Sequence, residues 1–158
     1  MLLSLLRIKN LALVEDLEWE LTSGFTAITG ETGAGKSIII GALKLLLGDR
    51  ADKSLIRTGA EACTVEAVFV GDDFAELNAR LEEAGVDPCE EELIVKRIFS
   101  LGGTSRHFVN GSPATLGLLK TIGDELVDLH GPHDHQSLLA PERQLALLDG
   151  FARADSSL

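Results

Sequence analysis

The first residues able to do chemistry are eight consecutive ones with the spacing Gly-x4-Gly-Lys-Ser. They are Gly30, Glu31, Thr32, Gly33, Ala34, Gly35, Lys36 and Ser37. Because glycine lacks a Cβ atom, the backbone here can turn successive N–H groups toward the oxygens of a phosphate. The Lys36 ammonium should reach the β- and γ-phosphates, and the Ser37 hydroxyl should ligate Mg²⁺. The spacing therefore predicts a site for a nucleoside triphosphate, with ATP and Mg²⁺ as the expected ligands.

This phosphate loop needs a strand before it and a helix after it. Residues 25–29 follow the turn signal Ser23-Gly24 and predict a short strand that leads into the loop. Residues 37–47 predict a helix that is apolar nearly all round and therefore buried on several sides, with Gly48 as its stop. The positive end of the helix dipole would face the anion. The alternative is a glycine-rich turn that only caps a buried helix.

A second polar cluster follows a short apolar strand predicted over residues 126–129. It contains His130, His133, Asp134, His135 and Gln136. Imidazole and carboxylate groups are common metal ligands, but the spacing matches no recognised zinc pattern and no cysteine lies close in sequence. A metal site and a solvated loop are both compatible with these residues.

The remaining pattern predicts an α/β domain with no internal repeat or linker. Residues 3–9 and 13–21 predict two strands, the second with apolar and acidic residues in alternation. Further strands are expected at 62–70, 92–99 and 105–109, and helices at 73–84, from Ser112-Pro113 to Ile122, and from Pro141 onward. We expect a mixed sheet with a parallel core and an antiparallel β flank.

Composition bounds the class of protein. The 158 residues, 45% of them hydrophobic, are enough for one domain with a buried core. A formal net charge of -11 argues against a general nucleic-acid-binding surface, so any contact with DNA should be local. The basic residues expected to form it are Arg57, Lys96, Arg97, Arg106 and His107.

Two cysteines give no disulfide framework, and the apolar start falls short of a membrane span of about 20 residues. These features predict a cytoplasmic protein with no membrane partner.

Together with four other segments, the phosphate loop resembles a known family. The segments are Leu6-x-Ile8-x-Asn10, residues 28–37, Leu47-Gly48-x-Arg50-Ala51, Ile56-Arg57-Thr58-Gly59-Ala60 and Leu129-His130-Gly131. They resemble the N-terminal half of the head domain in the RecN family, SMC-like ATPases of the ABC type in bacterial DNA double-strand break repair. The resemblance implies the N-terminal lobe of a P-loop NTPase head over residues 1–150. Residues 151–158 would begin the connection to a coiled coil, with the C-terminal lobe beyond it.

The resemblance also implies a role for residues near the ends of two elements. Asn10, with Arg7 and Lys9, would border the base or ribose, whereas the alternative for these residues is an outward strand face. Arg50 would reach the nucleotide through its planar guanidinium, and the alternative is an arginine that is only solvated.

The Q-loop of such ATPases offers a glutamine to Mg²⁺ and to the attacking water, but Pro132 stands where that glutamine is expected. Gln136 is our candidate for this part, as a Mg²⁺ ligand and as a catalytic residue beside Lys36. A histidine of the same loop or a water is the alternative.

The chain contains no signature motif, and its nearest imitation of a Walker B motif is residues 145–149, Leu-Ala-Leu-Leu-Asp. Gly150 stands where a catalytic glutamate would follow, so we interpret the segment as the end of an amphipathic helix. The resemblance then implies half of an ATP hydrolase, which binds ATP alone without significant turnover. Its partners would be the C-terminal lobe of the same protein, a second head in an ATP-dependent homodimer, and DNA through the full-length protein in the nucleoid. A self-contained P-loop NTPase or kinase that does not act on DNA, and a nucleotide-gated interaction module, are the competing hypotheses.

Overall fold

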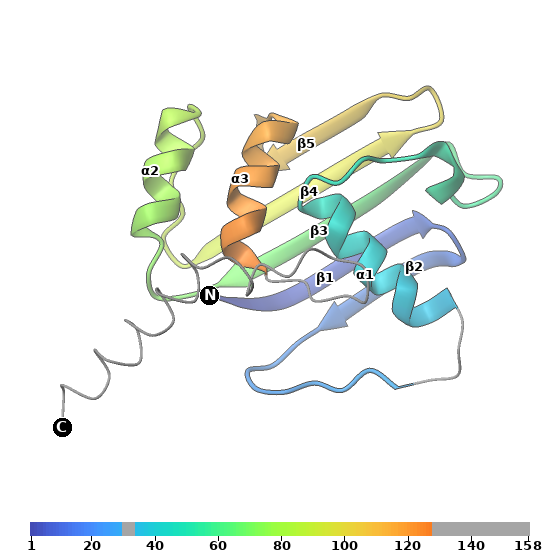
Figure 1. Cartoon of the computed structure of the whole chain (residues 1–158), viewed down its shortest axis with the longest axis horizontal. Helices are drawn as coiled ribbons and strands as arrows, with labels where there is room; N and C mark the ends of the chain where they lie inside the picture. Colours follow the sequence, from blue (N-terminus) through green and yellow to red (C-terminus); the bar gives the residue numbers. More distant parts are fainter. Residues whose placement is uncertain (30–33, 128–158) are drawn as a thin grey trace, which may run out of the picture. The chain divides into compact units, whose positions relative to one another are not determined.

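An antiparallel sheet organises the part of the chain that is described, residues 1–29 and 34–127 of a computed structural model (Figure 1). Its strands are β1 (Leu2–Leu11), β2 (Val14–Glu20), β3 (Ala62–Val70), β4 (Glu92–Ser100), β5 (Ser105–Val109) and β6 (Ser112–Ala114). They lie in the order β2-β1-β3-β4-β5-β6. The chain divides into two compact units, Met1–Leu126 and Val127–Leu158, and the sheet belongs to the first.

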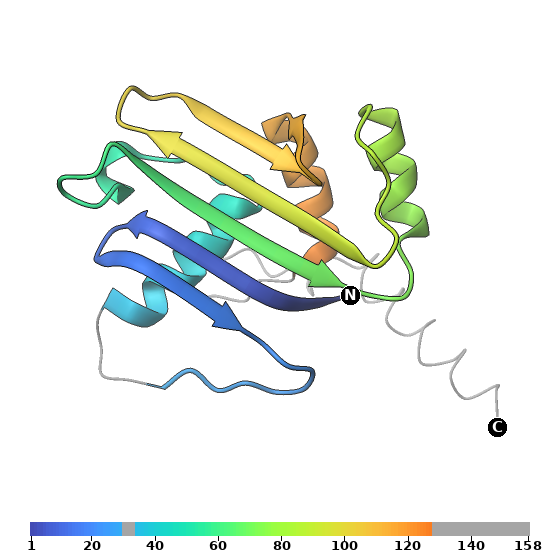
Figure 2. The ribbon, with the colours of Figure 1, turned by 180° about the vertical axis from the view of Figure 1, so that it is seen from behind.

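The helices of this unit are α1 (Ala34–Leu46), α2 (Ala75–Glu83) and α3 (Leu116–Leu126), with a short 3-10 turn η1 (Lys53–Leu55). Helices α1 and α3 lie on one face of the sheet, in front of it in Figure 1 and behind it in Figure 2. Contacts of α1 with β1, β3 and β4 place the helix over the middle of the sheet. No helix in the part that is described is long and apolar enough to cross a membrane.

The strands alternate between the two faces of the sheet, as period-two side chains require. On β3 and β4 the residues that face the helices are buried: Cys63, Val65, Ala67, Phe69, Leu93, Val95, Arg97 and Phe99. The intervening residues are more exposed and carry the charged side chains of Glu66 and Lys96. The core therefore lies between the sheet and the helices, and the other face of the sheet is open to solvent.

Most sequence predictions of single elements are confirmed. The strands expected at 3–9, 13–21, 62–70, 92–99 and 105–109 are β1, β2, β3, β4 and β5 with small shifts at the ends. The helices expected at 37–47 and 73–84 are α1 and α2, and Gly48 ends the first with a φ of 98°.

Residues 25–29 were predicted to form a strand, and this prediction is wrong for the described structure. They have no regular secondary structure, and the Phe25 side chain is 96% exposed. An apolar run forms a strand only where a neighbour takes up its backbone hydrogen bonds. The sheet ends at β2 on this side, and no described strand pairs with residues 25–29.

The predicted cap at Ser112-Pro113 is also wrong. Asn110 and Gly111 both have positive φ, 49° and 80°, which is the geometry of a tight hairpin turn. Ser112 and Pro113 therefore fold back to pair with β5 as strand β6. Helix α3 begins after them, and the Thr115 hydroxyl accepts a hydrogen bond from the Leu118 N–H at 3.1 Å.

The antiparallel flank of the expected sheet is confirmed, and every strand pair among the described residues is antiparallel. The two remaining strands expected from the sequence are residues 25–29, which form none, and 126–129. Leu126 ends α3 instead of starting a strand. Residues 128 and 129 and the helix expected from Pro141 lie outside the described residues.

Candidate nucleotide-binding site

The start of α1 brings Gly35, Lys36 and Ser37 into one helical turn. Ala34 is the first residue of the helix, so these three residues complete its first turn. The first four N–H groups of a helix have no partner within it and, with the helix dipole, favour an anion. The first turn of α1 has no acidic residue to repel that anion. This end of the helix therefore suits a phosphate group.

The same turn has room for a ligand. Gly35 and Ser37 are exposed and Lys36 is half-buried. A Cβ atom built on Gly35 would meet no atom within 4 Å, so a ligand can approach the backbone there. A lysine, a hydroxyl and the backbone N–H groups at a helix start are the donor set that a triphosphate with Mg²⁺ needs. The described residues of the loop thus fit the ligands expected from the sequence.

Arg97 anchors the other end of α1. This side chain is 5% exposed, and its Nη1 donates to the carbonyl oxygens of Leu45 at 2.6 Å and Asp49 at 2.5 Å. Its Nε donates to Ser105 Oγ at 3.1 Å. Burial lowers the pKa of the Arg97 guanidinium, but an arginine stays protonated in proteins. The helix that starts at the phosphate loop is therefore held at its last turn by a buried cation.

The local DNA patch predicted from Arg57, Lys96, Arg97, Arg106 and His107 is wrong for Arg97, because its side chain is buried. Pairing of β4 with β5 puts Lys96 and Arg106 on the open face and Arg97 and His107 on the helix face. The missed signal is the position of Arg97 in register with the buried residues Leu93, Val95 and Phe99.

Asn10 lies where β1 turns into β2. Asn10 and Ala12 have positive φ, 54° and 50°, and the Asn10 carbonyl accepts a hydrogen bond from the Arg57 N–H at 2.9 Å. Arg57 Nη1 also donates to the Leu13 carbonyl at 3.0 Å. Figures 1 and 2 both draw this turn at the end of the sheet where α1 begins. A contact of Asn10 with a nucleotide stays a prediction.

Arg50 is exposed and follows the C-terminal end of α1. Residues 38–49, which include most of α1, separate it from the phosphate loop. A helix of 13 residues such as α1 is about 20 Å long at roughly 1.5 Å per residue. The structure therefore does not bring Arg50 to the first turn of α1, and its contact with a nucleotide also stays a prediction.

Arg7 belongs to a row of charges on the open face. Its Nε contacts Glu18 Oε2 at 2.7 Å and its Nη1 contacts Glu66 Oε1 at 3.1 Å, while Lys96 Nζ lies 3.1 Å from Glu66 Oε2. The hydrogen bond that Arg7 donates to Glu18 is the main cause that raises the pKa of Arg7. Lys9 lies on the same face, beside a cavity of about 170 Å³. Arg7 and Lys9 thus form an outward strand face.

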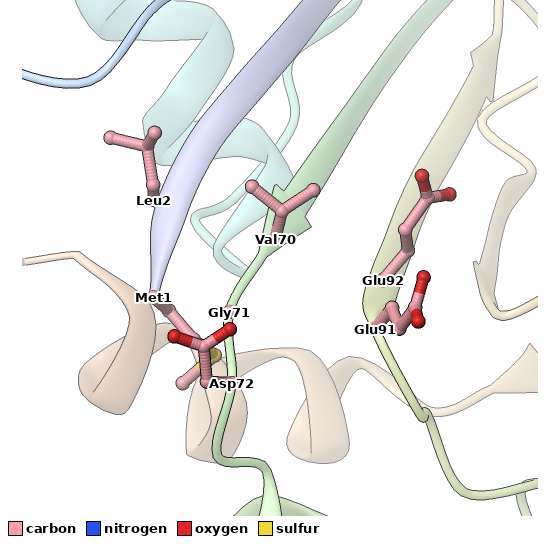
Figure 3. A pocket seen from close by; sticks show the side chains of 7 residues that line it. All are labelled: Met1, Leu2, Val70, Gly71, Asp72, Glu91 and Glu92. Carbon is pink, nitrogen blue, oxygen red and sulfur yellow. The ribbon is translucent and has the colours of Figure 1, made fainter.

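A larger cavity, about 570 Å³, lies at the other end of the sheet, where β1 begins and β3 ends (Figure 3). Its lining is Met1, Leu2, Val70, Gly71, Asp72, Glu91 and Glu92. Three carboxylates around one cavity would repel a phosphate, and the figures draw the start of α1 at the opposite end of the sheet. This cavity is therefore separate from the candidate site.

Several predicted site residues lie outside the described residues: Gly30, Glu31, Thr32, Gly33, Pro132 and Gln136, with the histidines around Gln136, the segment 145–149 and the connection 151–158. Within the ranges 1–29 and 34–127 no group of three or more His, Cys, Asp or Glu side chains could hold a metal ion.

Known proteins resemble most of the chain in sequence. A family model described as an AAA domain matches residues 5–105. The DNA repair protein RecN of Vibrio cholerae is 46% identical over 151 residues, and that of Bacillus subtilis is 40% identical over 154 residues. These matches cover 96% and 98% of the chain, which spans only 27% of the length of either relative.

Solved structures share the fold. The SMC head domain from Thermotoga maritima superimposes with a TM-score of 0.59 at 29% identity, over 79% of this chain and 42% of that one. A chain from a study of ATP-driven dimerization and DNA-stimulated activation of SMC ATPases gives a TM-score of 0.64 at 22% identity, over 93% of this chain and 97% of that one. The sheet and its helices thus have the architecture of an SMC-type head lobe. The chain belongs to the AAA domain family, and the relatives that it resembles along nearly its whole length are the RecN DNA repair proteins.

Proposed function

We propose that the chain is the ATP- and Mg²⁺-binding lobe of a larger SMC-like ATPase head. The observation that carries this proposal is the place of Lys36 and Ser37 in the first turn of α1, directly after the glycine-rich loop. Lys36 would balance charge on the β- and γ-phosphates, and Ser37 would hold Mg²⁺, which supplies further positive charge to the phosphates. Asn10 would border the base or ribose, Arg50 would contact the nucleotide, and Gln136 would complete the Mg²⁺ site.

The rest of the head would come from outside these 158 residues. The chain lacks a signature motif and a Walker B acid, and it spans 27% of the length of its RecN relatives. The exposed Phe25 and Ile28, 96% and 42% exposed, supply apolar surface next to the phosphate loop that a C-terminal lobe would cover. Residues 1–150 would form this lobe and 151–158 would begin the connection to a coiled coil.

The complete protein would hydrolyse ATP and act in DNA double-strand break repair and recombination in the bacterial cytoplasm, at the nucleoid. Two heads would join through ATP held between the phosphate loop of one and the signature motif of the other, and hydrolysis would release them. The names of the relatives, DNA repair proteins, support this cellular process. One structural neighbour comes from a study of the ATP-driven dimerization of SMC ATPases, and this supports the proposal that ATP joins two heads.

Calorimetric titration of the chain with ATP and Mg²⁺ tests the site. Lys36→Ala removes the charge that faces the phosphates, so we expect ATP to bind at least about tenfold more weakly while circular dichroism stays unchanged. Lys44→Ala is the matched control, because it removes the same charge from the last turn of the same helix. Equal ATP affinity in Lys36→Ala and the parent would overturn the assignment of the site.

Turnover separates the proposed half-site from a self-contained NTPase or kinase. The chain alone should bind ATP and release no phosphate above background, because the acid that activates water is supplied elsewhere. Steady-state ATP hydrolysis by the pure chain, absent in Lys36→Ala, would favour the self-contained enzyme instead.

A further inference from the structure

Arg97 differs from the other charged side chains of the described residues, because it is the one that is buried. Burial of a cation costs free energy unless hydrogen bonds replace the lost water. Arg97 has three such acceptors: the carbonyl oxygens of Leu45 and Asp49, and the hydroxyl of Ser105. A leucine or methionine would fill the same place in the core without that cost, so the charge itself calls for an explanation.

The acceptors of Arg97 lie at the C-terminal end of α1. Leu45 belongs to the last turn of the helix, and its carbonyl oxygen accepts hydrogen bonds from the Gly48 N–H at 3.2 Å and from Arg97. A cation at this end also interacts favourably with the helix dipole. Asp49 precedes Arg50, so the same guanidinium fixes the backbone just before that residue.

Ser105 and His107 extend the link to the neighbouring strand. The Ser105 hydroxyl lies 2.9 Å from Nε2 of His107, and it accepts the hydrogen bond from Arg97. Both residues are on β5, which pairs with β4 next to Arg97. The β4–β5 hairpin is thereby connected, through one side chain, to the helix that starts at the phosphate loop.

We propose that Arg97 is a positioning residue of the nucleotide site, because it fixes the C-terminal end of α1 and so sets where the first turn of that helix lies. A helix of 13 residues transmits a shift at one end to the other, since its backbone hydrogen bonds make it a stiff element. Lys36 and Ser37 therefore take their place from a contact at the opposite end of α1. This inference rests on the proposed function of the phosphate loop.

Three variants of the chain test it by calorimetric titration with ATP and Mg²⁺. Arg97→Met keeps the volume and removes all three hydrogen bonds, so we expect ATP to bind about tenfold more weakly. Arg97→Lys keeps the charge but cannot donate in the fork geometry of a guanidinium. Its affinity for ATP should therefore lie between that of the parent chain and that of Arg97→Met. Arg106→Met makes the same change on the exposed face of β5 and should bind ATP as the parent does.

Thermal unfolding and amide hydrogen exchange separate positioning from folding. If Arg97→Met unfolds cooperatively and binds ATP like the parent, the proposal is overturned. If Arg97→Met does not fold, Arg97→Lys takes its place in the test. Weaker ATP binding by Arg97→Lys at an unchanged unfolding midpoint supports the proposal, and an affinity equal to that of the parent overturns it.

Amide exchange also keeps this inference apart from the proposed function. The amides of Leu47 and Asp49 bond to the carbonyl oxygens of Leu43 and Lys44 in the last turn of α1. If the parent chain binds no ATP, the proposed function fails. Faster exchange of these two amides in a folded Arg97 variant then still supports the anchor, and unchanged exchange refutes it.

Discussion

A Cβ atom on Gly123 would lie 2.9 Å from the Cβ atom of Leu47 and 3.1 Å from its carbonyl oxygen. Helix α3 therefore crosses the end of α1 at a distance that only glycine allows. Gly48, the next residue after Leu47, repeats the relationship, because a Cβ atom there would come within 3.1 Å of the Lys120 backbone nitrogen. The last turn of α1 is thus held from one side by Arg97 and from the other by α3.

Gly123→Ala should destabilise the chain because its methyl group meets backbone atoms and a Cβ atom that cannot rotate away. We expect a loss of about 1–3 kcal/mol in the free energy of unfolding, as in other overpacked cores. Urea denaturation measures it. Gly117→Ala is the matched control in the same helix, since its Cβ atom has only the Thr115 hydroxyl near it, at 3.8 Å. That variant should gain up to about 1 kcal/mol from helix propensity, and equal behaviour of both variants would contradict the close crossing.

Glu66→Gln should destabilise the chain at neutral pH. Burial raises the pKa of Glu66. The hydrogen bonds and the positive charges of Lys96 and Arg7 lower this pKa by more than burial raises it, so the pKa lies below the ordinary value of 4.5. The ionised carboxylate thus stabilises the fold above that pH, and this contribution is lost as the pH falls through the folded-state pKa. We expect a loss of about 1 kcal/mol at pH 7, because Arg7 and Lys96 both lose the charged partner that lies between them, although Arg7 keeps its contact with Glu18.

Urea denaturation at pH 7 and pH 3 measures this contribution, and the difference between parent and Glu66→Gln should shrink at the lower pH. Glu18→Gln removes a carboxylate that is 53% exposed from the same row of charges, so its effect should be smaller, within about 0.5 kcal/mol. An effect of Glu66→Gln that does not depend on pH would contradict the assigned ion pairs.

Phe25→Ser should leave the free energy of unfolding of the chain within about 0.5 kcal/mol of the parent, because the ring buries almost no surface. The same change should raise solubility by removing an exposed aromatic ring. Urea denaturation and the concentration at which the chain precipitates measure the two effects. A loss of several kcal/mol would show that residues 25–29 pack against the domain.

The elements that the sequence predicts best are those whose pattern reflects burial on one side. The alternation on β3 has a period of two because one face meets the helices, and β2 alternates half-buried with exposed residues over most of its length, so the positions of both strands could be read directly. Residues 25–29 have the same apolar character, but a strand also needs a neighbour for its backbone, and no local pattern reports that. At Ser112-Pro113 a helix cap and an edge strand have the same local residues, and the Asn110-Gly111 turn decided between them.

The candidate site, like the fold, could be predicted only in part from local sequence. Lys36 and Ser37 could be placed at the start of a helix because the motif and the helix pattern are contiguous in sequence. The contact of Arg97 with the Leu45 carbonyl joins residues 52 positions apart, and such a contact leaves no local signal. A charge in register with buried apolar residues was the one available sign that Arg97 points into the core.

The imidazole of His107 should make the stability of the fold depend on pH. Burial lowers its pKa below the ordinary value of 6.5, and the positive charge of Arg97 lowers it further. In the unfolded chain the imidazole takes up a proton as the pH falls below about 6.5, whereas in the folded chain it stays neutral until a lower pH. The unfolded state therefore binds more protons in this window, and the free energy of unfolding decreases as the pH is lowered, by at most about 1.4 kcal/mol per pH unit for this group.

His107→Gln removes the titration and keeps a polar group beside Ser105, so it isolates this contribution. The free energy of unfolding of parent and variant, measured by urea denaturation between pH 5 and pH 8, should differ by a constant above about pH 6.5. Below that pH the parent should lose stability relative to the variant, because only the parent has a histidine that the fold keeps neutral. The other three histidines are present in both proteins and cancel in the comparison. A difference that stays constant down to pH 5 would mean that His107 is protonated as readily in the fold as in the unfolded chain, and that Arg97 exerts no field at Nε2.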